Sequence, residues 1–413
     1  MQMNGADSAS TGELPDRVRS EFPITASRAY LFSGGLAPAS RAVADAVEEW
    51  IRRWQFDPAV AWDHLFTEWE AVRIRLARLF GVTPASIAIV DGTSRASNLA
   101  VALLGSRRGG NVVVDATTYP SSLFPWLLPE RAEIEVRRAS SGAAGLAATP
   151  EDFEPLVDER TVAVSITHVD PLSGFRHDLR PIADLAHSHG AVLIVDIAQS
   201  AGVVPLDLVE QGVDLAAGTA MKWLLGPPGI GYLYVSEAVL AATGAPQVGY
   251  LGADLEPGDP LQLRLREDAR RHELGLASLL GMPGFRAGLD LILDVGVPAI
   301  GAHVEGLLAR CIDGLHAIGL KTTTPAEPAH RAGLLAIPAK SPADLQAFLR
   351  ERGVDIWGHE PANLIRVDPH LFNNHDDIER FLDGIESYLD VHGPDSIQGA
   401  RATSSQPPEA TRT

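Results

Sequence analysis

Short apolar runs alternate with amphipathic segments through roughly the first two thirds of the chain. The runs lack an apolar–polar alternation, which is typical of strands that are covered on both faces. Helical stretches such as Leu179–His189 separate most of them. This βαβ rhythm predicts an α/β fold with a mostly parallel sheet. The predicted strands are Ile87–Val90, Val112–Val114, Val162–Ile166, Val192–Ile197, Asp214–Thr219 and Ile230–Val235.

The pattern changes after about Gly281. A long helical stretch is followed by short apolar runs that are separated by amphipathic segments, which predicts a smaller α+β domain. Its predicted elements are strands at Leu334–Pro338, Val354–Trp357 and Leu364–Val367 and helices at Pro342–Arg352 and Asp376–Val391. Near the N-terminus, apolar spacing predicts one helix through Val43 and Trp54 and another from Leu65 to Leu79.

These boundaries divide the chain into four segments. We expect a partly disordered N-terminal arm (1–29), a large domain (30–280), a small C-terminal domain (281–392) and a disordered tail (393–413). The tail is rich in Pro, Ser, Thr and Gly and shows no apolar periodicity.

Composition and charge narrow the classes of function. The chain is 46% hydrophobic and 21% charged, which is ordinary for a globular protein. Its net charge of −19 opposes binding to nucleic acid. No apolar run approaches the roughly 20 residues that span a bilayer, and the N-terminus does not read as a secretory signal. With one cysteine, no intrachain disulfide can form, so we expect a cytoplasmic protein without membrane contact.

Candidate chemistry follows the predicted strands, because ligands of open α/β sheets bind beyond the carboxyl ends of the strands. Thr93 and Ser94 follow Gly92 at the start of a predicted helix, where hydroxyl and N–H groups suit a phosphate. An ordinary helix cap is the alternative. Asp196 ends an apolar strand and could pair with a protonated pyridine nitrogen, or it could cap the next turn.

Lys222 follows another predicted strand and lies among apolar neighbours. Burial would lower the pKa of its amine, and the neutral amine can attack an aldehyde. A surface lysine with a partly covered stem is the alternative.

The segment Val195–Gly202 (VDIAQSAG), followed by Thr219-Ala-Met-Lys222 and a Gly/Pro-rich stretch, resembles the class V aminotransferase branch of fold type I pyridoxal-phosphate enzymes. The resemblance extends from Tyr30 to Tyr388. That branch includes cysteine desulfurases, kynureninases, isopenicillin N epimerase-like proteins and some aminotransferases. The resemblance implies a large domain on a mostly parallel seven-stranded sheet, a smaller C-terminal α+β domain, pyridoxal 5'-phosphate as cofactor, and a homodimer with active sites at its interface.

The resemblance also implies roles for single residues. Lys222 would hold the cofactor as a Schiff base, Asp196 would pair with its pyridine nitrogen, and Gln199 would lie near its phenolic oxygen. Tyr119, in a kynureninase-like Tyr-Pro-Ser-Ser run, would stack on the ring, although a buried structural tyrosine is the alternative. The phosphate would be held by Thr93, Ser94 and Thr219.

On the substrate side, Arg366 matches the arginine that binds the substrate carboxylate, a role that suits its planar fork. A surface arginine on an edge strand is the alternative. The loop Ser33-Gly34-Gly35 would line this side of the pocket. Asp170 stands where many members carry asparagine near the cofactor, so a carboxylate there would change the local charge.

The type of reaction depends on a thiol and on the fate of a proton. Cysteine desulfurases accept sulfur on a loop cysteine, whereas Cys311 lies on a predicted core face, so a persulfide mechanism is disfavoured. The remaining chemistry proceeds through an external aldimine and a Cα carbanion. A β-eliminating or C–S lyase reaction is the first choice, ahead of an aminotransferase, an epimerase or a decarboxylating deaminase. A non-catalytic relative is disfavoured because Lys222, Asp196 and Arg366 are all present, and no metal motif is found.

Overall fold

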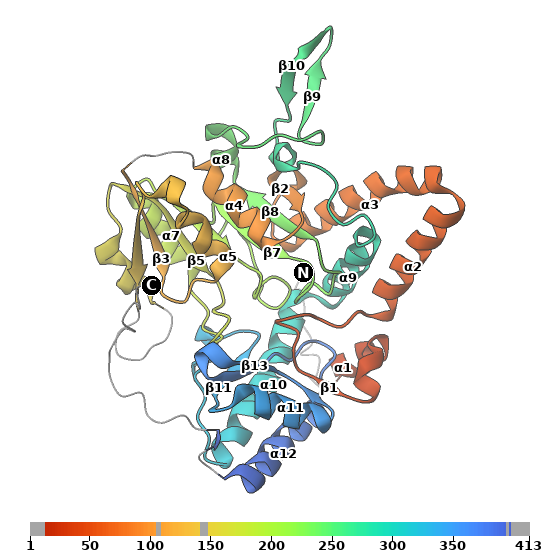
Figure 1. The fold of residues 1–413 in the computed structure, drawn as a ribbon, viewed down its shortest axis with the longest axis vertical. Coiled ribbons are helices and arrows are strands. Elements are labelled where there is room, and N and C mark those ends of the chain that lie inside the picture. Colours follow the sequence, from red (N-terminus) through yellow and green to blue (C-terminus); the bar gives the residue numbers. More distant parts are fainter. Residues whose placement is uncertain (1–12, 105–108, 141–147, 394–395, 398–413) are drawn as a thin grey trace, which may run out of the picture.

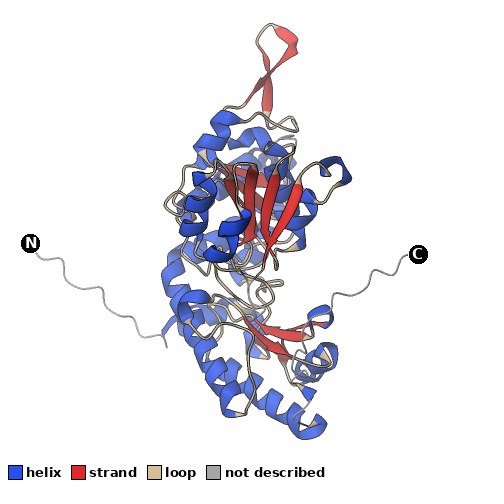
Figure 2. Ribbon diagram, turned by 90° about the vertical axis from the view of Figure 1, so that its left-hand side faces the viewer, coloured by secondary structure: helices blue, strands red, loops and turns tan. Residues whose placement is uncertain are grey.

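The computed structural model describes residues 13–104, 109–140, 148–393 and 396–397. Most of the segment predicted to be a disordered tail therefore lies outside the described residues, while Ile397 is buried in the core. The elements are a central sheet with helices on both faces, a C-terminal part below it, and a hairpin that projects from the top (Figures 1 and 2).

The central sheet has seven strands in the order β2-β8-β7-β6-β5-β3-β4. The pairs from β7 through β6, β5 and β3 to β4 are parallel, while β8 runs antiparallel to β7 and β2. The predicted mostly parallel seven-stranded sheet is therefore confirmed. Its strands are β2 (Ile87–Val90), β3 (Asn111–Asp115), β4 (Glu135–Ala139), β5 (Thr161–Thr167), β6 (Val192–Asp196), β7 (Leu215–Thr219) and β8 (Gly231–Val235).

Both faces of this sheet are buried. In β2, Ile87 and Ile89 pack into one hydrophobic cluster, and Ala88 and Val90 pack into a second one. This alternation follows the period of two in a strand, and the two clusters are therefore the two covered faces. Helix α4 (Thr93–Leu103) contributes to the second cluster, and α7 (Leu179–Ser188) contributes to the first.

Short helices and an exposed hairpin complete the large part of the chain. The short helices are α1 (Glu13–Val18), α5 (Pro120–Leu123), α6 (Pro150–Phe153) and α8 (Glu237–Ala242). Strands β9 (Ala253–Glu256) and β10 (Asp259–Leu265) pair only with each other and form the hairpin that projects in Figure 1. Two long helices, α2 (Arg41–Phe56) and α3 (Pro58–Leu79), form an arm on the opposite side from β3.

The C-terminal part is a three-stranded antiparallel sheet with helices around it. Strand β12 pairs in parallel with β1 (Ala29–Tyr30), so the N-terminal segment docks onto this part. Helix α9 (Met282–Val295) packs against α2 and α3 instead. The elements of the C-terminal part are α10 (Val297–Ala317), β11 (Leu335–Pro338), α11 (Pro342–Glu351), β12 (Val354–Asp355), β13 (Trp357–His359), β14 (Leu364–Val367) and α12 (His375–His392).

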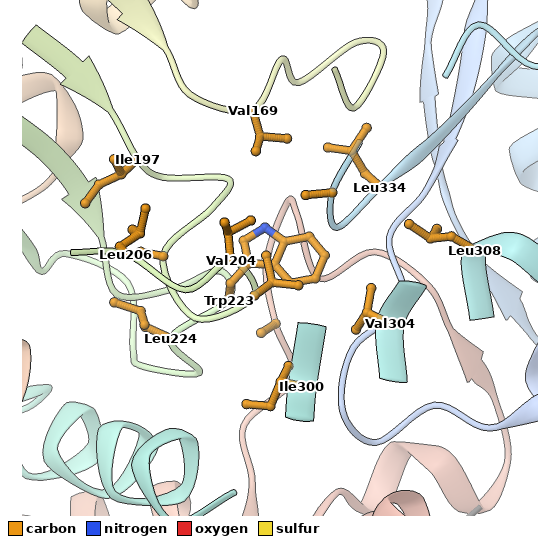
Figure 3. Packing of buried hydrophobic residues seen from close by; sticks show 14 of the residues in the cluster. Val169, Ile197, Val204, Leu206, Trp223, Leu224, Ile300, Val304, Leu308 and Leu334 are labelled. Atoms are coloured by element: carbon orange, nitrogen blue, oxygen red, sulfur yellow. The ribbon is translucent and has the colours of Figure 1, made fainter. Parts of the chain in front are cut away.

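A continuous core joins the two parts. The indole of Trp223 lies between Val204 of the large part and Val304 of α10, and Leu334 closes over it (Figure 3). Within the described residues, no single helix is long and apolar enough to cross a membrane, and α9 and α10 together meet that criterion only as a pair bent by 80°.

Candidate active site

A cavity of about 660 Å³ lies at the carboxyl ends of β6 and β7, where the sheet faces the C-terminal part. Several separate stretches of chain reach it: the loop after β1, the starts of α4 and α5, the loops after β5, β6 and β7, and the strands β13 and β14. The cavity brings together nine of the residues that the sequence predicts, namely Gly34, Gly35, Thr93, Ser94, Tyr119, Gln199, Thr219, Lys222 and Arg366.

The amine of Lys222 is buried in this cavity. Its pKa is lowered to about 8, mainly by desolvation; the carboxylates of Asp196 and Asp368 oppose this shift, and the charge of Arg366 adds to it. The Nζ atom lies 5.7 Å from the centre of the Tyr119 ring. A pKa near 8 leaves roughly a tenth of the amine neutral at pH 7, which is the nucleophilic form.

The turn after β7 fixes the position of Lys222. The N–H of Leu225 donates to the carbonyl of Lys222 (3.0 Å), and the N–H of Gly226 donates to that of Ala220 (2.9 Å). Leu225 adopts left-handed backbone, with φ of 58°, which is unfavourable for a leucine. Its burial, together with that of the neighbouring Trp223, holds the turn in this conformation.

Asp196 ends β6 beside the cavity. Its Oδ1 accepts a hydrogen bond from the N–H of Ala198 (2.9 Å), and its Oδ2 accepts one from the hydroxyl of Ser122 (3.0 Å). Burial raises the pKa of this carboxyl, while these donors and Lys222 act in the opposite direction. Sequence reasoning missed the part played by Ser122, although this serine stands in the Tyr-Pro-Ser-Ser run already noted.

The Gln199 amide is held at both ends. Its Oε1 accepts from the indole N–H of Trp223 (2.9 Å), and its Nε2 donates to the carbonyl of Gly34 (3.0 Å). One amide N–H is therefore left for the cavity, because an amide nitrogen carries two. The role of Trp223 was not predicted, since the sequence cannot show that the residue after Lys222 folds back onto Gln199.

The start of α4 faces the cavity with its N–H groups uncapped. Gly92 is the N-cap and has no side chain to accept from them, while Thr93 and Ser94 line the cavity. Thr219 closes the same end, and its hydroxyl donates to the carbonyl of Ile230 (3.2 Å). Free N–H groups at the start of an 11-residue helix suit a phosphate.

Arg366 is buried on β14 and heavily bonded. Its Nε donates to both carboxylate oxygens of Asp368 (2.8 and 2.9 Å), and its Nη1 donates to the carbonyl of Pro171 (2.9 Å). Trp357 pairs with it across the sheet, and its ring centre lies 4.4 Å from the guanidinium carbon. The sequence identified this arginine but not the carboxylate beside it.

Besides Asp196, which lies beside the cavity, two predicted residues do not line it. Ser33 is fully buried behind the loop that carries Gly34. Asp170 lies in the wall of a neighbouring cavity, and its Oδ1 accepts from the N–H and hydroxyl of Ser173 (2.6 and 2.7 Å). The adjacent Pro171 reaches the first cavity instead, so a direct cofactor contact from Asp170 stays a prediction.

Cys311 is buried on α10 within the core. Burial raises the pKa of its thiol far above the usual range. It is the only cysteine of the chain, so the described cavity contains no thiol.

These residues fit pyridoxal phosphate. The cavity offers an amine of lowered pKa for the aldehyde, and the buried carboxylate of Asp196 for the ring nitrogen. It also offers an aromatic face at Tyr119 and the uncapped start of α4 for the phosphate. Lys222 and Asp196 are also close enough to act on each other electrostatically.

The chain is similar to known proteins over most of its length. Residues 29–381 match the family model "Aminotransferase class-V". It is 27% identical to an uncharacterized aminotransferase, YcbU, of Bacillus subtilis, covering 90% of this chain and 97% of the relative. It is 28% identical to a kynureninase of Deinococcus radiodurans, covering 91% and 94%.

A solved structure agrees in fold. The apo cysteine desulfurase of Thermococcus onnurineus superposes with a TM-score of 0.82 at 24% identity, covering 91% of this chain and 98% of the other. The relatives carry different reaction names, so they identify the family and not the reaction. The chain belongs to the class V aminotransferase family and is a pyridoxal-phosphate-dependent enzyme that acts on an amino acid.

Proposed function

We propose that this enzyme is a β-eliminating lyase, of the C–S lyase type, for an amino acid with a leaving group on Cβ. The observation that carries the proposal is the buried, low-pKa amine of Lys222, which shares one cavity with Arg366 and with no thiol of the described chain. Sulfur transfer to an enzyme cysteine therefore has no acceptor at this site.

Each residue has a task that follows from its position. Arg366 binds the substrate carboxylate through its remaining N–H groups. Bound pyridoxal phosphate supplies an aldehyde for the substrate amine and a ring that stores electrons released at Cα. Asp196 would keep the ring nitrogen protonated, Gln199 would donate toward the phenolic oxygen, and Tyr119 would cover one face of the ring.

Proton movement is assigned to Lys222. Its neutral Nζ removes the Cα proton, and the Cβ–S bond then breaks with the electron pair leaving on sulfur. The ammonium form of Lys222 returns the proton to the departing thiolate. After release from the enzyme, the remaining fragment, 2-aminoacrylate, is hydrolysed to pyruvate and ammonia.

S-substituted cysteines test the reaction. We expect pyruvate and ammonia to form without an added keto acid, and we expect Lys222→Ala to abolish both. Amino transfer that requires a keto acid would instead support the second candidate, an aminotransferase. The similarity to a relative that is named an aminotransferase favours this candidate.

We also propose that the protein acts in the cytoplasm as a homodimer, on a small-molecule substrate and without nucleic acid or membrane. A net charge of −19 supports the absence of a polyanionic partner. Exposed aromatic side chains on α2 and α3 support a partner surface.

A further inference from the structure

Arg366 reaches the cavity as half of an ion pair. Both oxygens of Asp368 accept from its Nε, the side chain of Asp368 is fully buried, and that of Arg366 is 4% exposed. Burial raises the pKa of the Asp368 carboxyl, and Arg366 is the strongest influence in the opposite direction, followed by Lys222 and the N–H of Gly34. A buried carboxylate and a buried guanidinium in such contact stabilise each other's charged form.

The same contacts fix which edge of the guanidinium can serve a substrate. Asp368 occupies the Nε position, Pro171 takes one N–H of Nη1, and Trp357 covers one face. The outer edge, made of Nη1 and Nη2, remains for one carboxylate. Arg366 therefore offers one defined binding edge, and its charge is already balanced.

The other positive charges of the cavity offer little attraction to a second carboxylate. In the loaded protein, Lys222 would hold the cofactor and Asp196 would pair with its ring nitrogen, so Lys222 offers no free positive charge. Among the described residues that line the cavity, the remaining cation is Arg95, which stands at the phosphate end on α4 and donates to Gln247 (2.6 Å). Uncharged residues of the lining, besides the Gly34-Gly35 loop, include Phe32, Tyr119, Pro171, Met221 and Trp357.

We propose that Asp368 determines specificity: by holding Arg366 in an ion pair, it restricts the site to amino acids with a single carboxylate and rejects those with an acidic side chain. This inference rests on the proposed function, because it requires that Arg366 binds the substrate carboxylate. An acidic side chain would lose its hydration and meet the negative charge of Asp368 without an unpaired cation to compensate.

Pairs of amino acids that differ only in charge provide the test. The protein loaded with pyridoxal phosphate is titrated with glutamine and glutamate, and with asparagine and aspartate, while the absorption spectrum of the bound cofactor is followed. We expect each amide to reach its half-maximal change at a concentration at least about tenfold below that of the matching acid. Equal values, or tighter binding of the acids, would overturn the inference.

The variant Asp368→Asn tests the cause. It keeps the size of the side chain and removes its charge, so it unmasks Arg366 and should narrow the acid-to-amide ratio by about tenfold, through tighter binding of the acids. An unchanged ratio in a folded variant overturns the inference. The matched control is Asp355→Asn, which breaks an ion pair with Arg28 outside the cavity and should leave the ratio as in the parent protein.

Two measurements keep the result interpretable. Thermal unfolding shows whether Asp368→Asn is folded; if it is not, the comparison of amides and acids on the unaltered protein decides alone. If neither these four amino acids nor an S-substituted cysteine alters the spectrum, the proposed function itself fails. If amino acids alter it but acids and amides behave alike, only the specificity assigned to Asp368 fails.

Discussion

At the scale of single residues, the buried amine of Lys222 gives the site a pH dependence. Desolvation lowers its pKa to about 8, so the neutral amine increases as the pH rises through that value. We expect the rate at which the apoprotein captures pyridoxal phosphate to rise about tenfold between pH 7 and pH 9, following the neutral fraction. Stopped-flow absorbance measures this rate.

Two variants serve as controls for this profile. Lys340→Ala removes an exposed lysine and should leave the profile unchanged, whereas Lys222→Ala should abolish capture. A profile that keeps rising toward the pKa of a free lysine would show that the amine is not desolvated in the apoprotein.

We expect the indole of Trp223 to act on the cofactor through Gln199, to which it donates a hydrogen bond. Trp223→Phe removes the hydrogen bond to Oε1 and lets the amide rotate away from Gly34. A hydrogen bond of this kind contributes about 1 kcal/mol, so we expect affinity for pyridoxal phosphate to fall about fivefold. Equilibrium titration by fluorescence or absorbance measures it.

A matched substitution separates this effect from a loss of packing. Trp126 is also buried, and its indole N–H has no hydrogen-bond partner within the described part of the chain. Trp126→Phe should lower the melting temperature without changing cofactor affinity. If both variants lose affinity for pyridoxal phosphate to the same extent, Trp223 affects the cofactor only by packing in the core.

At the scale of elements, a buried ion pair ties the arm to the sheet. Arg73 of α3 donates from Nη1 (2.6 Å) and Nη2 (3.2 Å) to Glu273, which also accepts from the N–H of Ile89 in β2 (2.7 Å). Both side chains are 3% exposed. Glu273→Gln would leave the buried guanidinium with only the half-exposed Glu70 as a charged partner, and we expect it to lower the free energy of unfolding by about 3 kcal/mol.

Chemical denaturation tests this prediction, with Glu49→Gln as the control. Glu49 pairs with Arg52 and Arg53 on the exposed face of α2, where ion pairs contribute little. We expect no measurable change for this control. A similar loss of unfolding free energy in both variants would contradict the claim that burial makes the ion pair between Arg73 and Glu273 strongly stabilising.

Elements that are buried on both faces were predictable from the sequence, and exposed ones were not. The predicted Ile87–Val90 matches β2 residue for residue because an uninterrupted apolar run has few alternatives in an α/β chain. Strand β4 (Glu135–Ala139) was missed because it lies at the sheet edge and reads EVRRA. The β9–β10 hairpin was missed because its side chains are mostly exposed and pack against no core.

In the candidate site too, some residues and contacts were predictable from the sequence and others were not. Lys222, Asp196 and Arg366 could be found from motif spacing, and the structure brings them together beyond the carboxyl ends of the central strands. Asp368 could have been found too, since it stands two residues after Arg366 and residues at that spacing share a face of a strand. The contact of Trp223 with Gln199 depends on the shape of a turn, which no local pattern specifies.

At the scale of the whole molecule, the arm formed by α2 and α3 exposes large apolar side chains. Phe56 is 77% exposed, and Trp62 and Phe66 pack edge to face on the surface with their ring centres 5.5 Å apart. Exposed patches of this kind mark protein interfaces. We expect the double variant Trp62→Glu/Phe66→Glu to shift the proposed homodimer toward monomer, as measured by sedimentation velocity.

Leu261→Glu is the control for this experiment. Leu261 is 95% exposed at the projecting hairpin, far from the arm in Figure 1. The same charge added there should leave the sedimentation coefficient unchanged. A parent protein that sediments as a monomer would contradict the dimer itself.

The position of Lys222 in the cavity has an analytical consequence. Lysine is scarce in this chain, so few other amines can react with the cofactor. Only Lys321 and Lys340 accompany it among 413 residues, and both are exposed. Borohydride treatment of the holoenzyme would attach a pyridoxyl group at position 222, where trypsin could then no longer cut. The peptide ending at Lys222 and the one starting at Trp223 would appear in a mass spectrum as one joined fragment, so a routine digest would report how many molecules carry their cofactor.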